Sequence, residues 1–154
     1  MIAGADSPLL AHARPALEAL DAWLERPQAA VPRRARELIG LGPGLTPSGD
    51  DYLGGLMIGL RAVGWRDRAA ALWRWLDPLA SERTSAISRA HLAAAANGEV
   101  HEALHDCVEA LFAAKAPPRD ARWSLLLSRL DAVGHCSGRD GLAGVVAVAR
   151  RQLR

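Results

Sequence analysis

Residues 40–51 read Gly-Leu-Gly-Pro-Gly-Leu-Thr-Pro-Ser-Gly-Asp-Asp and lead into an apolar run with helical spacing. The end of this stretch returns at residues 137–140 as Ser-Gly-Arg-Asp, with Ser137 lying 89 positions after Ser48. Both copies extend to the pattern Ser-Gly-x-Asp-x-Leu-x-Gly. A Gly-rich loop before an apolar helical run is typical of a helix N-terminus, where free backbone N–H groups and a capping side chain create a polar site. We therefore expect function to lie where the two helix starts meet.

Composition predicts an all-α protein. The chain is rich in Ala, Leu and Arg and has almost no β-branched or aromatic runs, so strands are hard to place. Short connections favour a compact bundle of seven or eight helices, in which two similar Gly-rich N-termini converge on a site. The chain is treated as one domain over residues 1–154, with leading helices in 1–39 and the signature blocks within 40–144. Capping and breaker residues place helices at 14–26, 32–39, 48–62, 66–76, 82–96, 99–115, 119–132 and 138–153.

Proline and glycine mark several boundaries of these predicted helices. Pro15 is expected near the start of the first helix, and Asp77-Pro78 is expected to end the helix over 66–76. Eight of the 14 glycines lie between residues 40 and 64. Because glycine weakens a helix, those inside the motif helix indicate close helix packing, and those in the loop indicate approach of a ligand. The packing glycines are Gly54, Gly55 and Gly59, and the ligand glycines are Gly42, Gly44 and Gly49.

Bulk properties exclude several classes of function. With 50% hydrophobic and 23% charged residues the chain is globular, and its net charge of +2 gives little reason to expect a nucleic-acid partner. Two cysteines, Cys107 and Cys136, form no disulfide framework and suit a reducing compartment. The start lacks the basic and apolar segments of a signal peptide, and no stretch reaches the roughly 20 apolar residues of a membrane span. These features predict a cytoplasmic protein without a membrane partner.

The repeated motif can be read as two capping boxes. Ser48 would cap its helix with Asp51 as the reciprocal acidic partner, and Ser137 with Asp140 would repeat this, which stabilises a helix whether or not a ligand binds. Asp50 is not needed for a cap. The second copy has Arg139 in its place, so the two could pair across a pseudo-twofold axis or flank a ligand.

Charge limits the ligands of such a site. Two carboxylates in the first helical turn oppose an anion, and the loop lacks the Lys of a phosphate-binding loop. The pattern therefore favours a ligand bearing an amide or ammonium group, or an anion bound with Mg²⁺ or with Arg139. His135 is a candidate for proton transfer, with a hydrogen bond to local backbone as the alternative. Thr84 and Ser88 share one helix face, so they either contact a ligand or serve as a cap and a small packing residue.

Three blocks of sequence resemble the signature blocks of the AllH-like family. They are residues 40–55, residues 84–88 with 95–98, and residues 134–140 with Gly144. The family includes a subunit associated with oxamate carbamoyltransferase, which in purine and allantoin breakdown interconverts oxalurate plus phosphate with oxamate plus carbamoyl phosphate. Two departures stand out: only about 40 residues precede the first block, where family members have an extra N-terminal portion, and Cys136 replaces a more usual Thr or Ser.

The resemblance implies a site over residues 44–51, at Thr84 and Ser88, and over residues 135–140. We expect a carbamoyltransferase component that binds a small polar metabolite, with other subunits or further copies of itself as partners. No cofactor is required by the sequence, and Mg²⁺ is a candidate. The predicted catalytic residues are His135 and Asp50. The predicted ligand-binding residues are Gly42, Gly44, Thr46, Ser48, Gly49, Asp51, Thr84, Ser88, Ser137, Gly138, Arg139 and Asp140.

Three alternative functions remain open. His101-Glu-Ala-Leu-His105 matches the zinc hydrolase pattern H-E-x-x-H, although a solvated helix face explains these residues more simply. The last two predicted helices have the outline of a helix-turn-helix, but residues 142–148 are apolar where base-edge donors would be needed. The third alternative is a non-catalytic subunit that binds a metabolite or acts as a scaffold together with partner chains.

Overall fold

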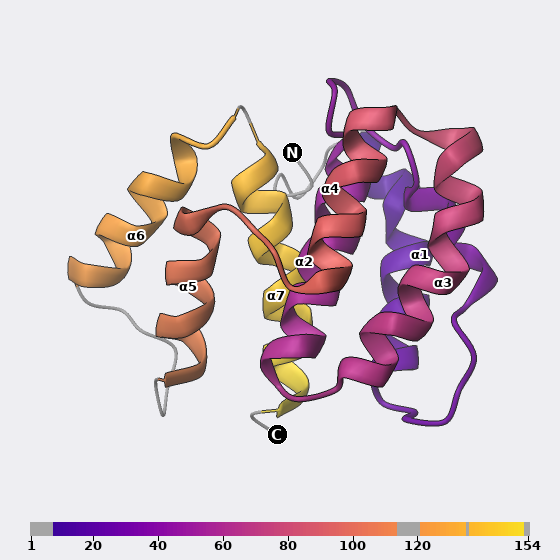
Figure 1. Ribbon diagram of the computed structural model, residues 1–154, viewed down its shortest axis with the longest axis horizontal. Coiled ribbons are helices and arrows are strands. Elements are labelled where there is room, and N and C mark those ends of the chain that lie inside the picture. The colour runs from indigo at the N-terminus through magenta and orange to yellow at the C-terminus, as the bar shows by residue number, and fades with distance from the viewer. Residues whose placement is uncertain (1–7, 114–120, 135, 153–154) are drawn as a thin grey trace.

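The computed structural model describes residues 8–113, 121–134 and 136–152, and within these ranges it contains helices and no strand. The prediction of an all-α fold is therefore confirmed (Figure 1). The elements are α1 (Pro8–Leu24), the 3-10 helix η1 (Arg33–Leu38), α2 (Ser48–Ala62), α3 (Arg66–Arg83), α4 (Ala86–Asn97), α5 (Glu102–Ala113), α6 (Ala121–Asp131) and α7 (Ser137–Gln152). No helix in the described part of the chain is both long enough and apolar enough to cross a membrane.

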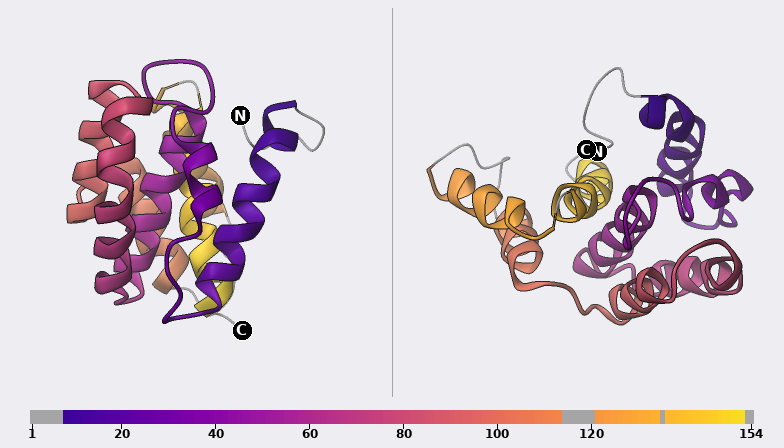
Figure 2. Two further views of the ribbon diagram at one scale, coloured as in Figure 1. Left: turned by 90° about the vertical axis from the view of Figure 1, so that its right-hand side faces the viewer. Right: turned by 90° about the horizontal axis from the view of Figure 1, so that it is seen from above.

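Helix α2, which carries the first motif, is the centre of the bundle. It packs against α7 on one side and against α3 and α4 on another, while α5 and α6 lie beyond α7 (Figure 1; Figure 2). Its buried residues include Leu53, Leu56 and Leu60, none of which has any exposed surface. A helix that is buried on most of its circumference cannot be amphipathic, which explains why its sequence is apolar and glycine-rich almost throughout.

Helices α2 and α7 approach each other closely through glycine, and they do so reciprocally. A Cβ atom on Gly55 would lie 1.8 Å from the carbonyl oxygen of Gly141, and one on Gly144 would lie 2.1 Å from that of Tyr52. Gly55 and Gly144 are equivalent positions of the repeated motif, and so are Tyr52 and Gly141. The helix pair therefore has local pseudo-twofold symmetry, and both helices begin at the same end of the bundle (Figure 1).

The packing assigned to the helical glycines is confirmed at two of the three positions. Besides Gly55, Gly59 lies against α7, where an added Cβ would be 3.1 Å from the Cα atom of Val145. Gly54 differs, because a Cβ there would make only an ordinary contact, 3.6 Å from the Cβ atom of Ala95. Gly55 and Gly59 are thus needed for helix contact, whereas Gly54 is not.

Two predicted helix boundaries at proline are wrong. Helix α1 extends through Pro15, and α3 extends through Pro78 to Arg83. In α3, Leu72, Leu76 and Ala80 follow one another at four-residue spacing and are all fully buried. This apolar stripe crosses the proline without interruption, so its packing outweighs the single backbone hydrogen bond that proline removes.

The predicted caps are corrected at three helix starts. Ser48 and Ser137 are the first helical residues of α2 and α7, and Pro47 occupies the cap position of α2 without a side-chain cap bond. Helix α4 begins at Ala86, because Ser85 caps it by accepting a hydrogen bond from the Ser88 backbone N–H at 3.0 Å. Its other end is at Asn97, one residue beyond the predicted range, and is followed by Gly98 in the left-handed conformation.

A pair of adjacent substitutions tests the helix contact. We expect Gly55→Ala to lower the free energy of unfolding by more than about 2 kcal/mol, because its Cβ would overlap the Gly141 backbone, which cannot move like a side-chain tip. Gly54→Ala should leave stability unchanged or raise it by up to about 1 kcal/mol through helix propensity. Urea unfolding of both variants makes the comparison, and equal effects at the two positions would contradict it.

Candidate functional site

The two motif copies meet at the N-terminal ends of α2 and α7. The hydroxyl oxygens Thr46 Oγ1 and Ser137 Oγ lie 2.8 Å apart and share a hydrogen bond. Both hydroxyls also hydrogen-bond the carboxyl group of Asp51. Thr46 comes from the loop before α2 and Ser137 is the first residue of α7, so three predicted ligand-binding residues from both copies form one polar cluster.

Asp50 lies behind this cluster and is tied into the protein framework. It is only 2% exposed. Its Oδ1 accepts a hydrogen bond from the Gly40 backbone N–H at 2.9 Å, and its Oδ2 accepts from the hydroxyls of Ser88, at 2.7 Å, and Thr84. The carboxylate thus joins the start of α2 to the end of η1, the end of α3 and the first turn of α4.

This network unites the first and middle signature blocks, as expected from the resemblance. It also commits both Asp50 oxygens to protein donors, which is the pattern of a structural anchor. The catalytic role assigned to Asp50 stays a prediction.

The alternative for Ser88, a small residue inside the packing, agrees with its 1% exposure. Thr84 ends α3, so its predicted alternative as the cap of α4 is wrong, and Ser85 holds that position.

Asp51 has an altered acidity. Its pKa is raised from 3.8 to about 6, mainly by burial and in smaller part by the neighbouring carboxylates of Asp140 and Asp50, and this value already includes the lowering effect of the hydrogen bonds with Ser137 and Thr46. Its Oδ2 atom is buried and has no hydrogen-bond partner within the described ranges. Asp51 therefore changes charge close to neutral pH.

A cleft of about 580 Å³ opens beside this cluster. Its polar wall is built from Thr46, Asp50, Asp51, Ser88 and Ser137. Exposed His91, Glu99 and His101 also line it, and apolar side chains from α2, α4, α5 and α6 form the remainder, among them Ile58, Leu92, Leu104 and Leu130. A concave, largely apolar space with a few convergent polar groups is the usual form of a small-molecule site.

The loop and helix-start glycines fall into two groups. An added Cβ on Gly49 would lie 2.0 Å from the carbonyl oxygen of Leu38, and one on the equivalent Gly138 would lie 2.6 Å from that of Leu130. Both glycines thus let a helix start rest on the backbone that precedes it. Gly44, in contrast, has a φ of +97° and open space where a Cβ would stand. Gly42 has a φ of +117° and lies against Ser48. Ligand contact by these glycines stays a prediction.

In the second copy of the motif, the adjacent residues Arg139 and Asp140 differ in exposure. Asp140 is 2% exposed, whereas Arg139 lies on the surface and binds Asp131 through two hydrogen bonds, one of them 2.6 Å long between Nη2 and Oδ2. The suggested pairing of Arg139 with Asp50 is therefore wrong. His135 lies outside the described residues, and its role in proton transfer stays a prediction.

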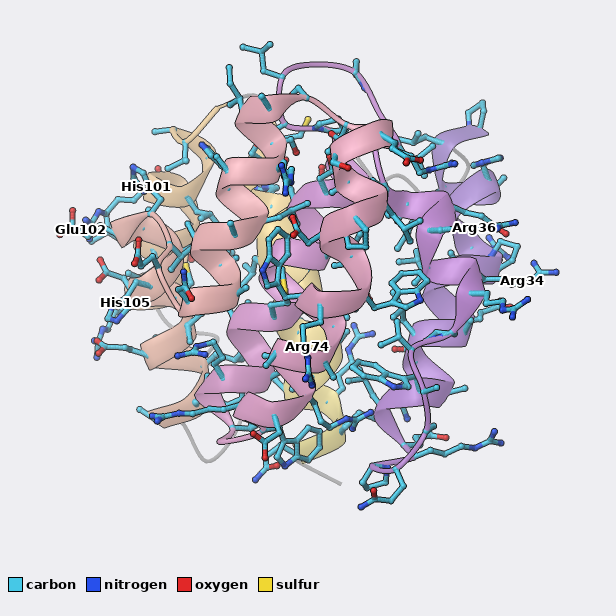
Figure 3. All side chains as sticks on the ribbon, turned by 45° about the vertical axis from the view of Figure 1, so that its right-hand side comes forward. Arg34, Arg36, Arg74, His101, Glu102 and His105 are labelled. Carbon is cyan, nitrogen blue, oxygen red and sulfur yellow. The ribbon has the colours of Figure 1, made fainter. Side chains whose placement is uncertain are left out.

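The H-E-x-x-H segment forms an exposed edge of the molecule. His101, Glu102 and His105 point outward from the start of α5 (Figure 3). His101 Nδ1 accepts a hydrogen bond from the Ala103 backbone N–H at 3.1 Å, so one of its two ring nitrogens is already engaged. Among the described residues, no group of three or more His, Cys, Asp or Glu is placed to hold a metal ion. The geometry agrees with the solvated-face interpretation of this segment.

Two residues at the site were missed from the sequence. Ser85 both caps α4 and donates a hydrogen bond to the Leu45 carbonyl oxygen at 2.8 Å, which fixes the Gly-rich loop against α4. Its position immediately before an Ala-rich helix was an available capping signal. His91 lines the cleft from α4, and no local pattern marks it, because the cleft exists only after the helices have packed.

Comparison with known proteins gives a family assignment. The sequence model of a family described as "Oxamate carbamoyltransferase subunit AllH" matches residues 38–149. This range covers most of the chain and includes both motif copies, the Thr84–Ser88 segment and the residues that build the cleft. No solved structure matches the chain.

Replacement of Asp50 tests its role as an anchor. We expect Asp50→Asn to lower the free energy of unfolding by about 2–4 kcal/mol, since an amide retains one acceptor oxygen for three buried donors. The control is Asp77→Asn, which removes an exposed carboxylate paired with Arg89 and should cost less than about 1 kcal/mol. Chemical denaturation measures both, and an Asp50→Asn protein as stable as the control would exclude the anchor.

Replacement of Asp51 tests its acidity. Because the pKa of Asp51 is raised from 3.8 to about 6 on folding, protonation contributes stability that is fully present below about pH 4 and is lost as pH rises through about 6. Asp51→Asn should therefore be more stable than the parent protein at pH 7.5, by on the order of 2 kcal/mol, and nearly equal to it at pH 4. Denaturation at several pH values measures the difference, and a gap that does not change with pH would refute the assignment.

Proposed function

Because this chain belongs to the AllH family of oxamate carbamoyltransferase subunits, we propose that it serves as one subunit of such an enzyme and binds a small polar metabolite of the carbamoyl or oxamate type. The observation that supports the proposal is the position of the cleft. It opens where the two Ser-Gly-x-Asp helix starts converge, and its polar wall contains residues from all three signature blocks: Thr46 and Asp51, Ser88, and Ser137.

The polar wall suits a ligand that carries carbonyl and amide groups. The hydroxyl oxygens of Thr46 and Ser137 can accept hydrogen bonds from a ligand amide, because the hydroxyl hydrogens serve the contact between these two residues and the contact with Asp51. Asp51 can accept a hydrogen bond as a carboxylate or donate one as an acid, since its pKa lies at about 6. Asp50 belongs to this wall and would keep it in place through its three hydrogen bonds.

A non-catalytic role within a larger assembly is the second candidate. Three large apolar side chains in the described ranges are exposed: Leu45 by 68%, Ile87 by 49% and Leu125 by 62%. The Leu45 carbonyl oxygen accepts the hydrogen bond from Ser85, and Ile87 lies two residues after Ser85, so the two exposed side chains belong to neighbouring segments. A partner subunit or a second copy of this chain could cover them. In this version the chain binds the metabolite, or scaffolds the assembly, and the partner performs the chemistry.

A ligand screen tests the proposal. Thermal unfolding of the full chain would be followed with oxamate, oxalurate, carbamoyl phosphate and phosphate, each with and without Mg²⁺ or Zn²⁺. A ligand at 100 times its Kd should stabilise the folded protein by about 2.7 kcal/mol. Ser137→Ala should reduce this shift strongly, because it removes a hydroxyl from the cleft wall. The control is Ser81→Ala, which removes an exposed hydroxyl bonded to the Pro78 carbonyl oxygen.

The outcomes separate the candidates. A shift with oxamate or a carbamoyl compound, weakened in Ser137→Ala and retained in Ser81→Ala, would support binding at this cleft. Absence of any shift until partner subunits are added would favour the assembly role. A shift with Zn²⁺ alone would instead direct attention to His101 and His105, contrary to the proposal.

A further inference from the structure

The Ser85 hydroxyl makes two hydrogen bonds that serve different purposes. Its oxygen accepts from the Ser88 backbone N–H at 3.0 Å, which caps α4, and its O–H donates to the Leu45 carbonyl oxygen at 2.8 Å. A helix cap needs only the acceptor, so an Asp at this position would cap α4 equally well. The donated bond joins α4 to a residue 40 positions earlier in the chain and adds nothing to the cap. It acts instead on the Gly-rich loop.

The middle of this loop, residues 42–46, is fixed at its two ends but not between them. On one side the Gly49 backbone N–H donates to the Leu41 carbonyl oxygen at 2.9 Å, and on the other the Pro47 carbonyl oxygen accepts from two N–H groups in the first turn of α2. Within the described ranges, residues 42–46 make no backbone–backbone hydrogen bond. The position of this segment therefore depends on its contacts with side chains.

Two hydroxyl contacts hold the segment to the helices on either side of it, at the end of the bundle where α2, α4 and α7 begin (Figure 2). Ser85 binds the Leu45 carbonyl at the start of α4, and Ser137 at the start of α7 lies 2.8 Å from the Thr46 hydroxyl oxygen. The Leu45 carbonyl group and the Thr46 Cα atom belong to one planar peptide unit, so a fixed carbonyl restricts where Thr46 can lie. Gly44, immediately before, has a φ of +97° and open space where a Cβ would stand, and thus adds no restraint of its own.

We propose that Ser85 is a positioning residue of the cleft: its O–H holds residues 42–46 against α4, which keeps Thr46 in the polar wall, and loss of this bond lets the segment move away from the polar end of the cleft. Ser85 is not among the residues that line the cleft, whereas Thr46 is, so Ser85 acts through Thr46. The inference rests on the proposed function for the presence of a ligand, but the control of the loop by Ser85 does not. Because the bond is exposed, water competes for both of its partners, and a ligand bound to Thr46 would favour the closed position.

Three replacements of Ser85 separate control of the loop from capping of α4. Ser85→Asp keeps an acceptor for the cap but has no hydrogen to donate to the Leu45 carbonyl oxygen at neutral pH, Ser85→Ala lacks both functions, and Ser85→Thr keeps both. Ala86→Asp is the control for charge, because it adds the same carboxylate at the exposed next residue and leaves the Ser85 hydroxyl in place.

Nuclear magnetic relaxation of backbone ¹⁵N in the full chain tests control of the loop without any ligand. The order parameters of Leu45 and Thr46 should have the rigid value of about 0.85 in the parent, Ser85→Thr and Ala86→Asp, and should fall below about 0.6 in Ser85→Asp. The midpoint of urea unfolding should fall in Ser85→Ala and stay close to the parent value in Ser85→Asp, because only the former loses the cap. Order parameters that do not change in Ser85→Asp would overturn the inference.

Isothermal titration calorimetry with oxamate tests the effect on the ligand. Loss of the one bond that positions Thr46 should weaken oxamate binding about fivefold in Ser85→Asp and in Ser85→Ala alike. Ser85→Thr and Ala86→Asp should bind oxamate as the parent does. If Ser85 served only as the cap of α4, binding would instead weaken in Ser85→Ala and be retained in Ser85→Asp.

The outcomes distinguish this inference from the proposed function. Equal oxamate affinity in Ser85→Asp and the parent would overturn the positioning role while leaving the proposed function standing. An equal loss of affinity in Ala86→Asp would do the same, because charge and not the lost bond would then be the cause. Failure of the parent to bind oxamate, oxalurate or carbamoyl phosphate would overturn the proposed function together with the ligand part of this inference, and the order parameters would still decide whether Ser85 controls the loop.

Discussion

The close approach of the α2 and α7 backbones is the constraint on which the rest of the structure depends. At Gly55 and Gly144 each helix rests on a carbonyl group of the other, a contact that a single methyl group would prevent. Because the contact is reciprocal, it fixes both the separation of the helices and their register. Both motif turns are thereby held at one end of the bundle, and the remaining helices pack around this pair.

Buried polar groups then fix what surrounds the pair. Asp50 joins α2 to η1, α3 and α4 through three hydrogen bonds, and Ser85 attaches the Gly-rich loop to α4. When both oxygens of a buried carboxylate accept hydrogen bonds, the segments around it can adopt few other arrangements, since each of them would leave a donor or the charge buried without a partner. Asp50 thus fixes the polar wall of the cleft, of which it is itself a part together with Ser88, Thr46, Asp51 and Ser137.

The same arrangement gathers negative charge where helix dipoles are positive. Asp50, Asp51 and Asp140 occupy the first turns of α2 and α7, and Asp50 accepts hydrogen bonds from three donors. The raised pKa of Asp51 is the physical consequence of this crowding and burial.

The sequence by itself determined the helical class, the bounds of α2, the family and the importance of two equivalent helix starts, because composition, glycine spacing and repeated motifs are local signals. It did not determine the passage of α3 through Pro78, since a local breaker rule carries no information about a buried stripe formed with other helices. Nor did it show that Asp50 is the acid anchored by three hydrogen bonds and that Asp51 is the one with a raised pKa. These neighbours have different surroundings: Asp50 accepts hydrogen bonds from three other segments, and Asp51 lies against the hydroxyls of Thr46 and Ser137. Only tertiary packing brings those groups together, so only the tertiary structure decided which acid is an anchor and which can hold a proton.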